Sequence, residues 1–334
     1  MPDSLKEYYP GSGGVNNTSK ATVRIQFEFD LLSGKILELE ITSYKVQDQE
    51  NAKKTTNNIR AKDLVLRDLG YFSLDVLESI NTNNGYFLSR LDTNTNAYRL
   101  KNGKLTIVDF SALERLMLES NISSLELELF LGKTKKLKVR TIVHLVPESL
   151  KNKRLRKHKA KKGKSVQKRK GKFIDRAGLT IFVTNAEKSD LEASMVRKLY
   201  SLRWQVEIVF KVWKSIAQID KTKKVKVERF EFTLYAKLIW IIVNWKMFWI
   251  LEQKLFRETG NLLSYIKVFK HLINYAGKFV DMMRNGSEAL CQYIESQYLI
   301  FVKRYPITIN KKKFNLKEIL EMLENHERIN HSTN

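Results

Sequence analysis

The chain has 334 residues, a length that allows one large domain or two ordinary ones. Its hydrophobic fraction of 43% is enough for a core and excludes a wholly disordered protein. Its 60 lysines and arginines against 36 aspartates and glutamates give a formal net charge of +24, which favours a polyanionic partner. Such a partner is most often nucleic acid and less often an acidic membrane surface. The one cysteine, Cys291, excludes an intramolecular disulfide framework and a cysteine-based zinc site, and it fits a reducing compartment.

The first part of the chain, residues 1–95, predicts strands with one helix among them. Two runs of alternating apolar residues, 21–32 and 35–46, predict antiparallel strands joined by a hairpin turn. Further on, residues 63–67 predict a short apolar strand that ends at Asp68. Residues 52–62 fit either a short helix or a loop, Ser73 is a plausible N-cap for a helix, and residues 85–91 predict another strand.

The second part, residues 96–178, predicts a β-rich insertion with one helix at 111–118. Its short β-like runs are 98–100, 104–108, 124–130 and 137–145. The composition then changes abruptly, because residues 151–172 carry 13 lysines and arginines and no acid.

The third part, residues 179–225, begins with a buried strand at 179–185 and continues into a helix. Ser189 and Glu192 fit a capping box, from which a long helix is predicted to run to about Ser215. The fourth part, residues 226–334, has a helical pattern to its end. Together the four parts predict an α/β core, a β-rich insertion and a helical C-terminal region.

The most apolar stretch, residues 234–251, approaches the length of a membrane span. Lys237, Asn244 and Lys246 interrupt it, which favours a buried helix over a span. Association with a membrane surface, through this helix and the basic run, remains an alternative interpretation.

Four polar residues recur on the predicted helix that ends near Ser215, namely Tyr200, Arg203, Glu207 and Lys214. On one continuous helix at about 100° per residue, they would fall within an arc of about 60°. A polar stripe on so apolar a helix predicts a cleft, a ligand or a polar network. The alternative is an ordinary surface ion pair between Arg203 and Glu207.

Asp68 stands where the apolar strand at 63–67 ends and Gly70 relaxes the backbone. A carboxylate at a strand end is well placed to hold a divalent metal in a cleft. The alternative is an ordinary turn residue, since aspartate is common before glycine in turns.

Together these residues resemble a family. The spacing Tyr200-x2-Arg203-x3-Glu207-x6-Lys214 is similar to the YREK signature of bacterial insertion-sequence transposases with a ribonuclease-H-like DDE core. Residues 68–72, DLGYF, resemble the second aspartate motif of this family, and the β-rich stretch before Glu207 resembles its strand insertion. The resemblance covers about residues 1–250 and implies a ribonuclease-H-like mixed sheet.

The chain departs from the family's pattern at its beginning. The family's first catalytic aspartate stands upstream of text that resembles residues 1–5, MPDSL. Asp3 falls on this later segment, and Asp30 falls in a hairpin turn. The resemblance therefore implies that the first aspartate, its strand and an N-terminal DNA-binding region are missing from this chain.

The resemblance implies DNA transposition, in which DNA strands are cut and joined by two-metal phosphoryl transfer. Asp68 and Glu207 would be ligands of Mg²⁺ or Mn²⁺, while Tyr200, Arg203 and Lys214 would contact phosphates near the scissile bond. With two matched carboxylates, metal binding is expected to be weak and this chain to be inactive alone. Metal binding would distinguish this interpretation from a non-catalytic DNA-binding protein that keeps the scaffold.

The basic run at 151–172 favours a flexible arm along DNA, which would gain affinity by counterion release. The alternative is a solvated loop. The candidate DNA-binding residues are Lys153, Arg154, Arg156, Lys157, Lys161, Lys162, Lys168, Arg169 and Lys170. Trp204 and Trp213 could stack on an unpaired base, but core packing is the favoured interpretation for both.

The partners implied are double-stranded DNA, as transposon ends and target, and a second copy of the chain in a synaptic complex, with no membrane. The implied location is the nucleoid in the bacterial cytoplasm.

Overall fold

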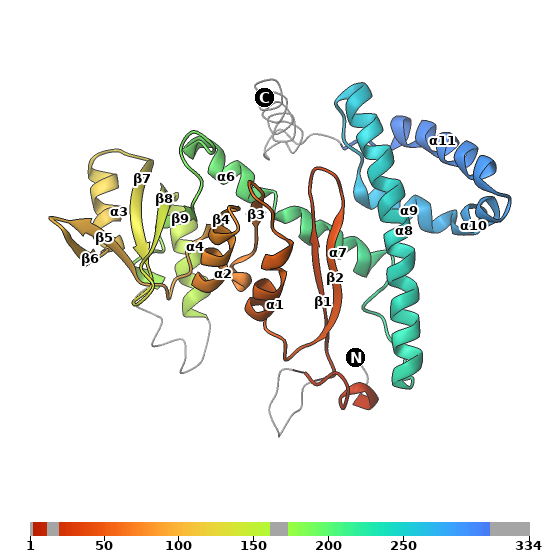
Figure 1. The fold of residues 1–334 in the computed structure, drawn as a ribbon, viewed down its shortest axis with the longest axis horizontal. Coiled ribbons are helices and arrows are strands. Elements are labelled where there is room, and N and C mark those ends of the chain that lie inside the picture. The colour runs from red at the N-terminus through yellow and green to blue at the C-terminus, as the bar shows by residue number, and fades with distance from the viewer. Residues whose placement is uncertain (1–2, 12–19, 161–172, 308–334) are drawn as a thin grey trace. The chain divides into compact units, whose positions relative to one another are not determined.

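The computed structural model describes residues 3–11, 20–160 and 173–307. Its contacts divide the chain into two compact units, Gln47–Arg203 and Met1–Val46 with Trp204–Asn334. Figure 1 shows the elements of both, and each unit is described by itself.

The unit Gln47–Arg203 is built on a seven-stranded mixed sheet with the order β3-β4-β9-β8-β7-β5-β6. Only β3 and β4 pair in parallel, and the other neighbours are antiparallel. The strands are β3 (Leu64–Leu66), β4 (Tyr86–Arg90), β5 (Ala97–Lys101), β6 (Lys104–Ile107), β7 (Ser124–Leu131), β8 (Leu137–Leu145) and β9 (Leu179–Thr184). This confirms the predicted α/β class and is consistent with a ribonuclease-H-like mixed sheet.

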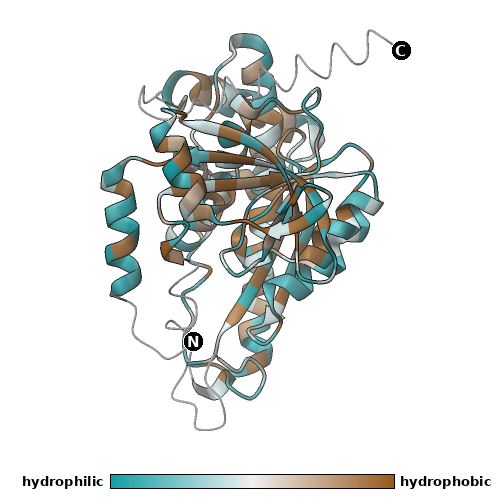
Figure 2. Ribbon diagram, turned by 90° about the vertical axis from the view of Figure 1, so that its left-hand side faces the viewer, coloured by the Kyte–Doolittle hydropathy of each residue, from teal (hydrophilic) through white to brown (hydrophobic). Residues whose placement is uncertain are grey.

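The described helices of this unit are α1 (Asp48–Lys54), η2 (Thr55–Asn58), η3 (Leu69–Tyr71), α2 (Leu74–Thr82), α3 (Phe110–Glu119), α4 (Glu148–Lys159) and α6 (Ala193–Ser201). Helices α1, α2 and α3 bury one side of the sheet. Helix α6 packs on the other side, because its Tyr200 contacts Phe182 of β9, which alternates with the core residues of that strand. Ile80 of α2 and Met117 of α3 lie in one core cluster with Phe87, Leu129 and Val143 of the strands. In Figure 2 the apolar bands concentrate on the strands at the centre. These contacts follow from the period-2 and helical patterns of the sequence.

The predicted β-rich insertion shares its sheet with other parts of the chain. Its last strand, β8, pairs along its length with β9, from Arg140↔Thr184 to Leu145↔Leu179. Strand β9 in turn pairs with β4. The contact boundaries therefore fall after Val46 and after Arg203 rather than at the ends of this segment.

The other unit begins with η1 (Asp3–Leu5) and the predicted hairpin, β1 (Val23–Phe29) and β2 (Ile36–Ser43). The turn is stabilised by Asp30, whose backbone carbonyl accepts a hydrogen bond from Gly34 N at 2.8 Å. Gly34 has a φ of +68°, and Trp245 Nε1 donates to its carbonyl at 2.6 Å. A Cβ at this position would lie 2.2 Å from the Trp249 ring, so glycine meets both a conformational and a steric requirement.

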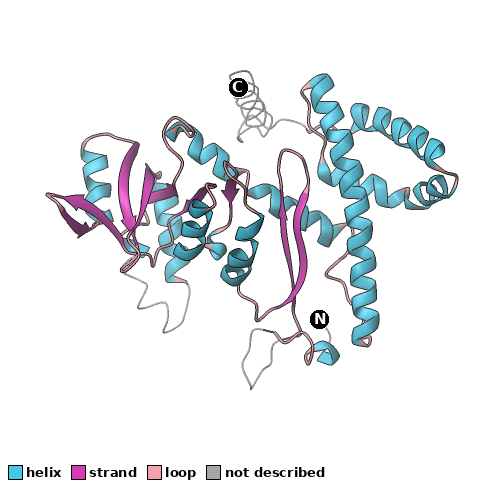
Figure 3. Cartoon of the chain, viewed as in Figure 1, coloured by secondary structure: helices cyan, strands magenta, loops and turns pink. Residues whose placement is uncertain are grey.

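Helices make up most of the described residues of this unit after the hairpin, as Figure 3 shows. They are α7 (Trp204–Ser215), α8 (Val227–Thr259), α9 (Tyr265–Asn274), α10 (Ala276–Arg284) and α11 (Ser287–Arg304). One face of the hairpin packs on α7 and α8, with the Phe27 ring 4.8 Å from Trp213 and 5.5 Å from Trp245. The predicted helical C-terminal region is thereby confirmed for its described residues.

Helix α8 contains the apolar stretch at 234–251. By length and composition it could cross a membrane, and 44% of its most apolar window is buried in the protein. Leu238, Ile241 and Trp245 pack in one core, and Met247 and Leu251 pack in another. Core helices pass the same test of length and composition, so this feature alone is weak evidence for a membrane.

One predicted cap was wrong, and the first part of the predicted flexible arm is helical. Ser73 is the N-cap residue of α2 as predicted, although its side chain makes no capping hydrogen bond. Helix α6 begins at Ala193 with Glu192 as N-cap, so Ser189 does not cap it. The first part of the basic run belongs to α4, because Lys and Arg are good helix formers and Arg154 ties the helix to β9.

Glu252 of α8 is a buried carboxyl whose ionisation should affect stability. It is 7% exposed, and its Oε2 accepts a hydrogen bond from Leu263 N at 2.6 Å. Burial raises the pKa of Glu252 to about 8, and the Leu263 hydrogen bond partly opposes this. The folded state therefore binds the proton more tightly than the unfolded state does, and ionisation opposes folding.

We expect the stabilising contribution of Glu252 to be complete below about pH 4 and to be lost as pH rises to about 8. Replacing Glu252 by glutamine should remove this dependence and make the protein more stable than wild type at pH 9. Urea unfolding across this pH range measures the effect. Equal pH dependence in both proteins would contradict it.

Candidate active site

Asp68 lies directly after β3, at the end of the sheet where the chain turns into η3. It occupies the N-cap position of η3 with φ −71° and ψ 161°, and its side chain makes no capping hydrogen bond. The side chain is 59% exposed. The strand-end placement predicted from the sequence is confirmed, and the carboxylate is accessible to a ligand.

Tyr200 is on α6, and it is buried at 8% exposure. Its ring packs edge-on against Phe182 of β9 at 5.3 Å, and its hydroxyl lies 3.5 Å from the carbonyl oxygen of Arg67. Burial raises the pKa of Tyr200, so the hydroxyl remains a proton donor at neutral pH. The tyrosine therefore lies next to the residue that precedes Asp68.

Arg203 follows α6 and points to the same place. Its Nη1 lies 3.7 Å from Asp68 Oδ1, and its guanidinium carbon lies 5.9 Å from the centre of the Tyr200 ring. The side chain is 22% exposed. Three predicted site residues from both ends of this unit are thus brought together by the fold, and Asp68 is 135 positions from Arg203 in the sequence.

The helix that was predicted to carry all four polar residues is interrupted. Leu202 and Arg203 form a turn between α6 and α7, and their backbone N–H groups donate to carbonyls three residues back, at 2.9 and 3.3 Å. The prediction of one continuous helix to Ser215 was therefore wrong, and the single arc of about 60° does not apply across the turn. The turn keeps Leu202 buried while Arg203 reaches Asp68.

Glu207 and Lys214 lie on α7, within the other unit. Both are exposed and line one open surface hollow of about 580 Å³, together with Phe210, Lys211, Ser215 and Asp220. Asp220 is a second carboxylate in this hollow that the sequence did not single out. The two ammonium groups of Lys211 and Lys214 on this helix face suit contact with phosphates.

Among residues 3–11, 20–160 and 173–307, no three His, Cys, Asp or Glu side chains form a group that could hold a metal ion. Asp68 belongs to one unit and Glu207 to the other. Their convergence on a shared metal stays a prediction.

The candidate DNA-binding residues of the basic run divide into three groups. Lys153, Arg156 and Lys157 are exposed on α4. Arg154 is turned inward, where it donates to the carbonyl oxygens of Ala177 at 3.1 Å and Leu179 at 2.7 Å. Lys161, Lys162, Lys168, Arg169 and Lys170 lie outside the described residues.

The two tryptophans of α7 differ. Trp213 is fully buried and donates from Nε1 to the Tyr265 hydroxyl at 3.2 Å, which confirms core packing. Trp204 is 55% exposed, so core packing was the wrong expectation for it. Trp204 is the first residue of α7, directly after the turn, and it is not among the buried residues of that helix.

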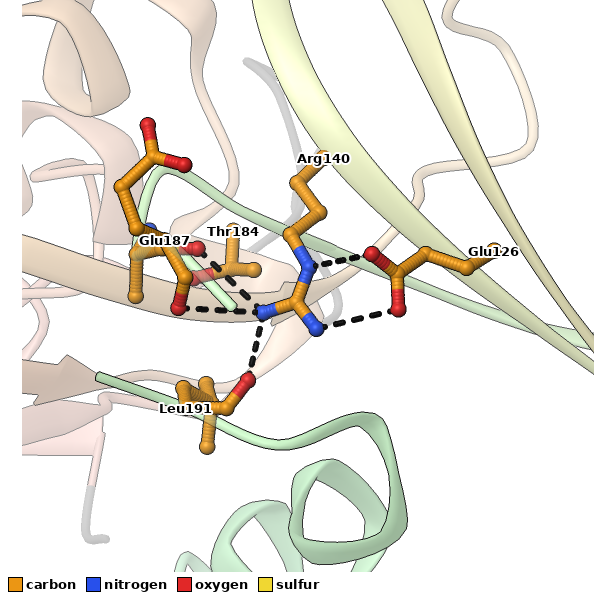
Figure 4. Close-up of polar contacts among 6 residues, drawn as sticks. Glu126, Arg140, Thr184, Glu187 and Leu191 are labelled. Carbon is orange, nitrogen blue, oxygen red and sulfur yellow. Dashed lines mark hydrogen bonds and ion pairs between the residues drawn. The ribbon is translucent and has the colours of Figure 1, made fainter. Parts of the chain in front are cut away.

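An arginine that the sequence did not single out fixes the approach to α6. Arg140 of β8 makes a two-pronged ion pair with Glu126 of β7, with N–O distances of 2.9 and 3.1 Å. Its remaining nitrogen donates to the carbonyl oxygens of Ala186, Glu187 and Leu191, as Figure 4 shows for Glu187 and Leu191. These hydrogen bonds hold the loop that leads into the helix of Tyr200. The signal in the sequence that could have indicated this ion pair was the alternation of Glu126 and Glu128 along β7.

Comparison with known proteins decides the family. The family model described as "Transposase DDE domain" matches residues 2–243. The chain belongs to this family. The match includes the hairpin, the whole seven-stranded sheet, Asp68, and both helices that carry Tyr200 and Glu207.

The relatives are insertion-sequence transposases. The chain is 30% identical to the transposase for IS1151 of Clostridium perfringens, over 96% of this chain and 71% of that protein. It is 32% identical to the IS231F transposase of Bacillus thuringiensis subsp. israelensis, over 86% of this chain. It is 33% identical to the IS231B transposase of subsp. berliner, over 88% of this chain. The chain spans 62% and 64% of the length of the two IS231 proteins.

Proposed function

We propose that this chain is the catalytic part of a DNA transposase of an insertion sequence, which cuts and joins DNA strands by metal-dependent phosphoryl transfer. One observation carries the proposal: within a chain of the DDE transposase family, Asp68, Tyr200 and Arg203 gather at one end of the sheet. An ion pair alone would not carry the proposal, because surface ion pairs between residues far apart in sequence are common. The combination of a strand-end carboxylate, a half-buried arginine and a buried tyrosine suits a phosphodiester site better than it suits an ordinary surface ion pair.

The residues fit a hard divalent cation. Asp68 offers an exposed carboxylate that is not used as a helix cap, and the Glu207 carboxylate is also exposed. Oxygen donors of this kind suit Mg²⁺ or Mn²⁺, which bind through one or two carboxylates and phosphate oxygens. When bound, such ions supply an activated nucleophile and stabilise charge on the leaving oxygen.

The remaining site residues would bind and orient the DNA. Arg203 has a planar guanidinium that suits two oxygens of one phosphate, and its approach to Asp68 keeps it near the metal ligand. Tyr200 would donate a hydrogen bond from a hydroxyl whose pKa burial raises. Lys214 would place a positive charge on a neighbouring phosphate from the face of α7.

Two carboxylates make an incomplete shell for two metal ions, since a second ion would face repulsion that the protein leaves uncompensated. We therefore infer that these 334 residues, tested by themselves, bind one Mg²⁺ weakly and do not cleave DNA. Robust Mg²⁺-dependent cleavage by the same 334 residues would contradict this.

The proposed partners are duplex DNA, as transposon ends and target, and a second copy of this chain in a synaptic complex. The proposed location is the bacterial nucleoid. DNA binding that persists with no measurable binding of Mn²⁺ would instead indicate a non-catalytic DNA-binding protein.

The exposed face of α4 gives a direct test of DNA binding. Replacing Lys153, Arg156 and Lys157 together by glutamine should lower the slope of log affinity against log salt by about 3, since each phosphate contact contributes about 0.9. Fluorescence anisotropy with a duplex of mixed sequence, titrated at several KCl concentrations, measures this slope. Arg154 is kept, because its hydrogen bonds to β9 anchor the helix.

The matched control removes three exposed lysines from helices α9 and α11, by replacing Lys267, Lys270 and Lys303 with glutamine. Its net charge equals that of the α4 variant, so a difference in slope reports on position rather than on total charge. Equal slopes for both variants would show that α4 does not contact phosphates.

A further inference from the structure

The outer ribbon of the seven-stranded sheet has an unusual charge distribution. Strands β5 and β6 pair as Tyr98↔Ile107, Arg99↔Thr106, Leu100↔Leu105 and Lys101↔Lys104, and β6 is the last strand of the sheet. Figure 1 shows this ribbon at the end of the sheet. Every residue of β6 is exposed. The ribbon therefore presents both of its faces and its tip to solvent.

The two faces of the ribbon differ in chemistry. Because side chains alternate along a strand and paired residues share a face, Arg99, Lys101 and Lys104 lie on one face with Thr106. Tyr98, Leu100, Leu105 and Ile107 lie on the other. No acidic residue occurs between Asp92 and Asp109. One face of the ribbon thus carries three cations and no acidic residue.

The tip of the ribbon is held in one conformation. Asn102 and Gly103 form a two-residue turn, and both have positive φ angles, of 49° and 74°. This is the combination that a type I′ hairpin turn requires, and its twist matches that of the strands. The cations on either side of the turn are therefore pre-organised rather than spread over a loose loop.

The arrangement at the tip works against local stability. Lys101 and Lys104 are directly opposite each other, and like charges in such pairs are destabilising. Within the part of the chain that the structure describes, no ion pair with Arg99, Lys101 or Lys104 offsets this. Lys133 and Lys136, from the adjacent β7–β8 turn, lie near Tyr98 on the other face of the ribbon and are not counted with these three cations. An external anion would relieve the repulsion.

We propose that the basic face of the β5–β6 ribbon binds the phosphate backbone of duplex DNA. A two-stranded ribbon is narrow enough to enter the major groove, which is about 12 Å wide. Arg99 and Lys101 are two residues apart on one strand, about 6.6 Å, so they can reach separate phosphates along one DNA strand. The contacts are to backbone oxygens and make binding strongly salt-dependent. This inference rests on the proposed function, since it assigns a second DNA-contacting surface to the same protein.

The first test replaces Arg99, Lys101 and Lys104 by glutamine in the full chain. The slope of log affinity against log salt for a mixed-sequence duplex should fall by about 3, while the control in which Lys267, Lys270 and Lys303 are replaced leaves it unchanged. The melting temperature of the ribbon variant should be equal to or above that of wild type, because a repulsive pair is removed. An unchanged slope for the ribbon variant, in a wild-type chain that does bind DNA, would overturn this inference and leave the proposed function standing. A wild-type chain without salt-dependent DNA binding would overturn both.

The second test assigns the face. In a Cys291→Ser background, a benzophenone label is attached at Thr106→Cys on the basic face or at Leu105→Cys on the apolar face, which are adjacent and both exposed. The label at 106 should crosslink to DNA and the label at 105 should not. Equal crosslinking to DNA from both positions, or crosslinking from 106 to a second protein chain only, would overturn the proposal. The latter result would identify the ribbon as a protein interface.

Discussion

Replacing Glu207 by glutamine is expected to weaken divalent-metal binding by this chain more than about 100-fold while its affinity for DNA stays the same or rises slightly. Loss of groups that only support a metal ligand already costs 10–100-fold, so loss of a ligand itself should cost more. The change keeps the size of the side chain and removes one negative charge, which leaves the basic surface of α4 intact. Mn²⁺ binding followed by electron paramagnetic resonance measures the effect.

Iron-dependent cleavage of the protein backbone tests whether Asp68 and Glu207 share an ion. Fe²⁺ bound in place of Mg²⁺ generates hydroxyl radicals in the presence of ascorbate and peroxide, and these cut the chain near the metal. Wild type should yield fragments that end near residue 68 and near residue 207. Both sets should disappear in Glu207→Gln and in Asp68→Asn. Cuts near residue 207 that persist in Asp68→Asn would show that the two carboxylates do not hold one ion.

Asp220→Asn is the matched control for this experiment. Asp220 lines the same hollow on α7 as Glu207 and is also exposed, but it lies outside the matched spacing. Its replacement removes the same charge from the same hollow and should leave Mn²⁺ binding and the iron-dependent fragments as in wild type. An equal loss in Asp220→Asn would assign the effect to the overall charge of the hollow.

The strands and the turns between them were predictable because they depend on local pattern. The alternation in 21–32 and 35–46 fixes which face of the hairpin is buried, and the polar turn between them contains the glycine that Trp249 requires. The strand end at Asp68 followed from the apolar run before it. These features need no knowledge of distant residues.

The turn at Leu202–Arg203 was not predictable, because the sequence has neither glycine nor proline there and the helical pattern continues on both sides. What interrupts the helix is tertiary: Arg203 is drawn to Asp68, and Leu202 is buried. The exposure of Trp204 follows from the same turn. Similarly, Arg154 and Lys157 are indistinguishable as charges in the sequence, and only the position of α4 beside β9 separates an anchor from a surface group.

The largest effect on stability is expected at Arg140. Replacing it by alanine should lower the free energy of unfolding by about 3 kcal/mol, because it leaves the Glu126 carboxylate without its partner and three backbone carbonyls without a donor. The Arg140 side chain is only 13% exposed, so water would replace these bonds poorly. Urea unfolding at pH 7 measures the loss.

The matched control is Lys138→Ala on the same strand. Lys138 pairs with Glu128 at 2.9 Å, but both side chains are more than half exposed, so the pair should contribute no more than about 0.5 kcal/mol. A loss for Arg140→Ala no larger than for Lys138→Ala would contradict the role assigned to the Arg140 network.

The effect of Arg140 should also depend on pH. Its hydrogen bonds lower the pKa of Glu126, so the folded state binds that proton less tightly than the unfolded state does. The stabilisation is therefore present above the unfolded pKa of about 4.3 and is lost as pH falls through the lower folded value. The difference in unfolding free energy between wild type and Arg140→Ala should shrink below about pH 4 to the part contributed by the carbonyl hydrogen bonds.

The hydrogen bonds from Arg140 to the backbone carbonyls hold Leu191 ahead of α6. Amide exchange in α6 should therefore be faster in Arg140→Ala than in wild type at every pH. Unchanged exchange in α6 would show that the Arg140 network does not control the placement of Tyr200 and Arg203.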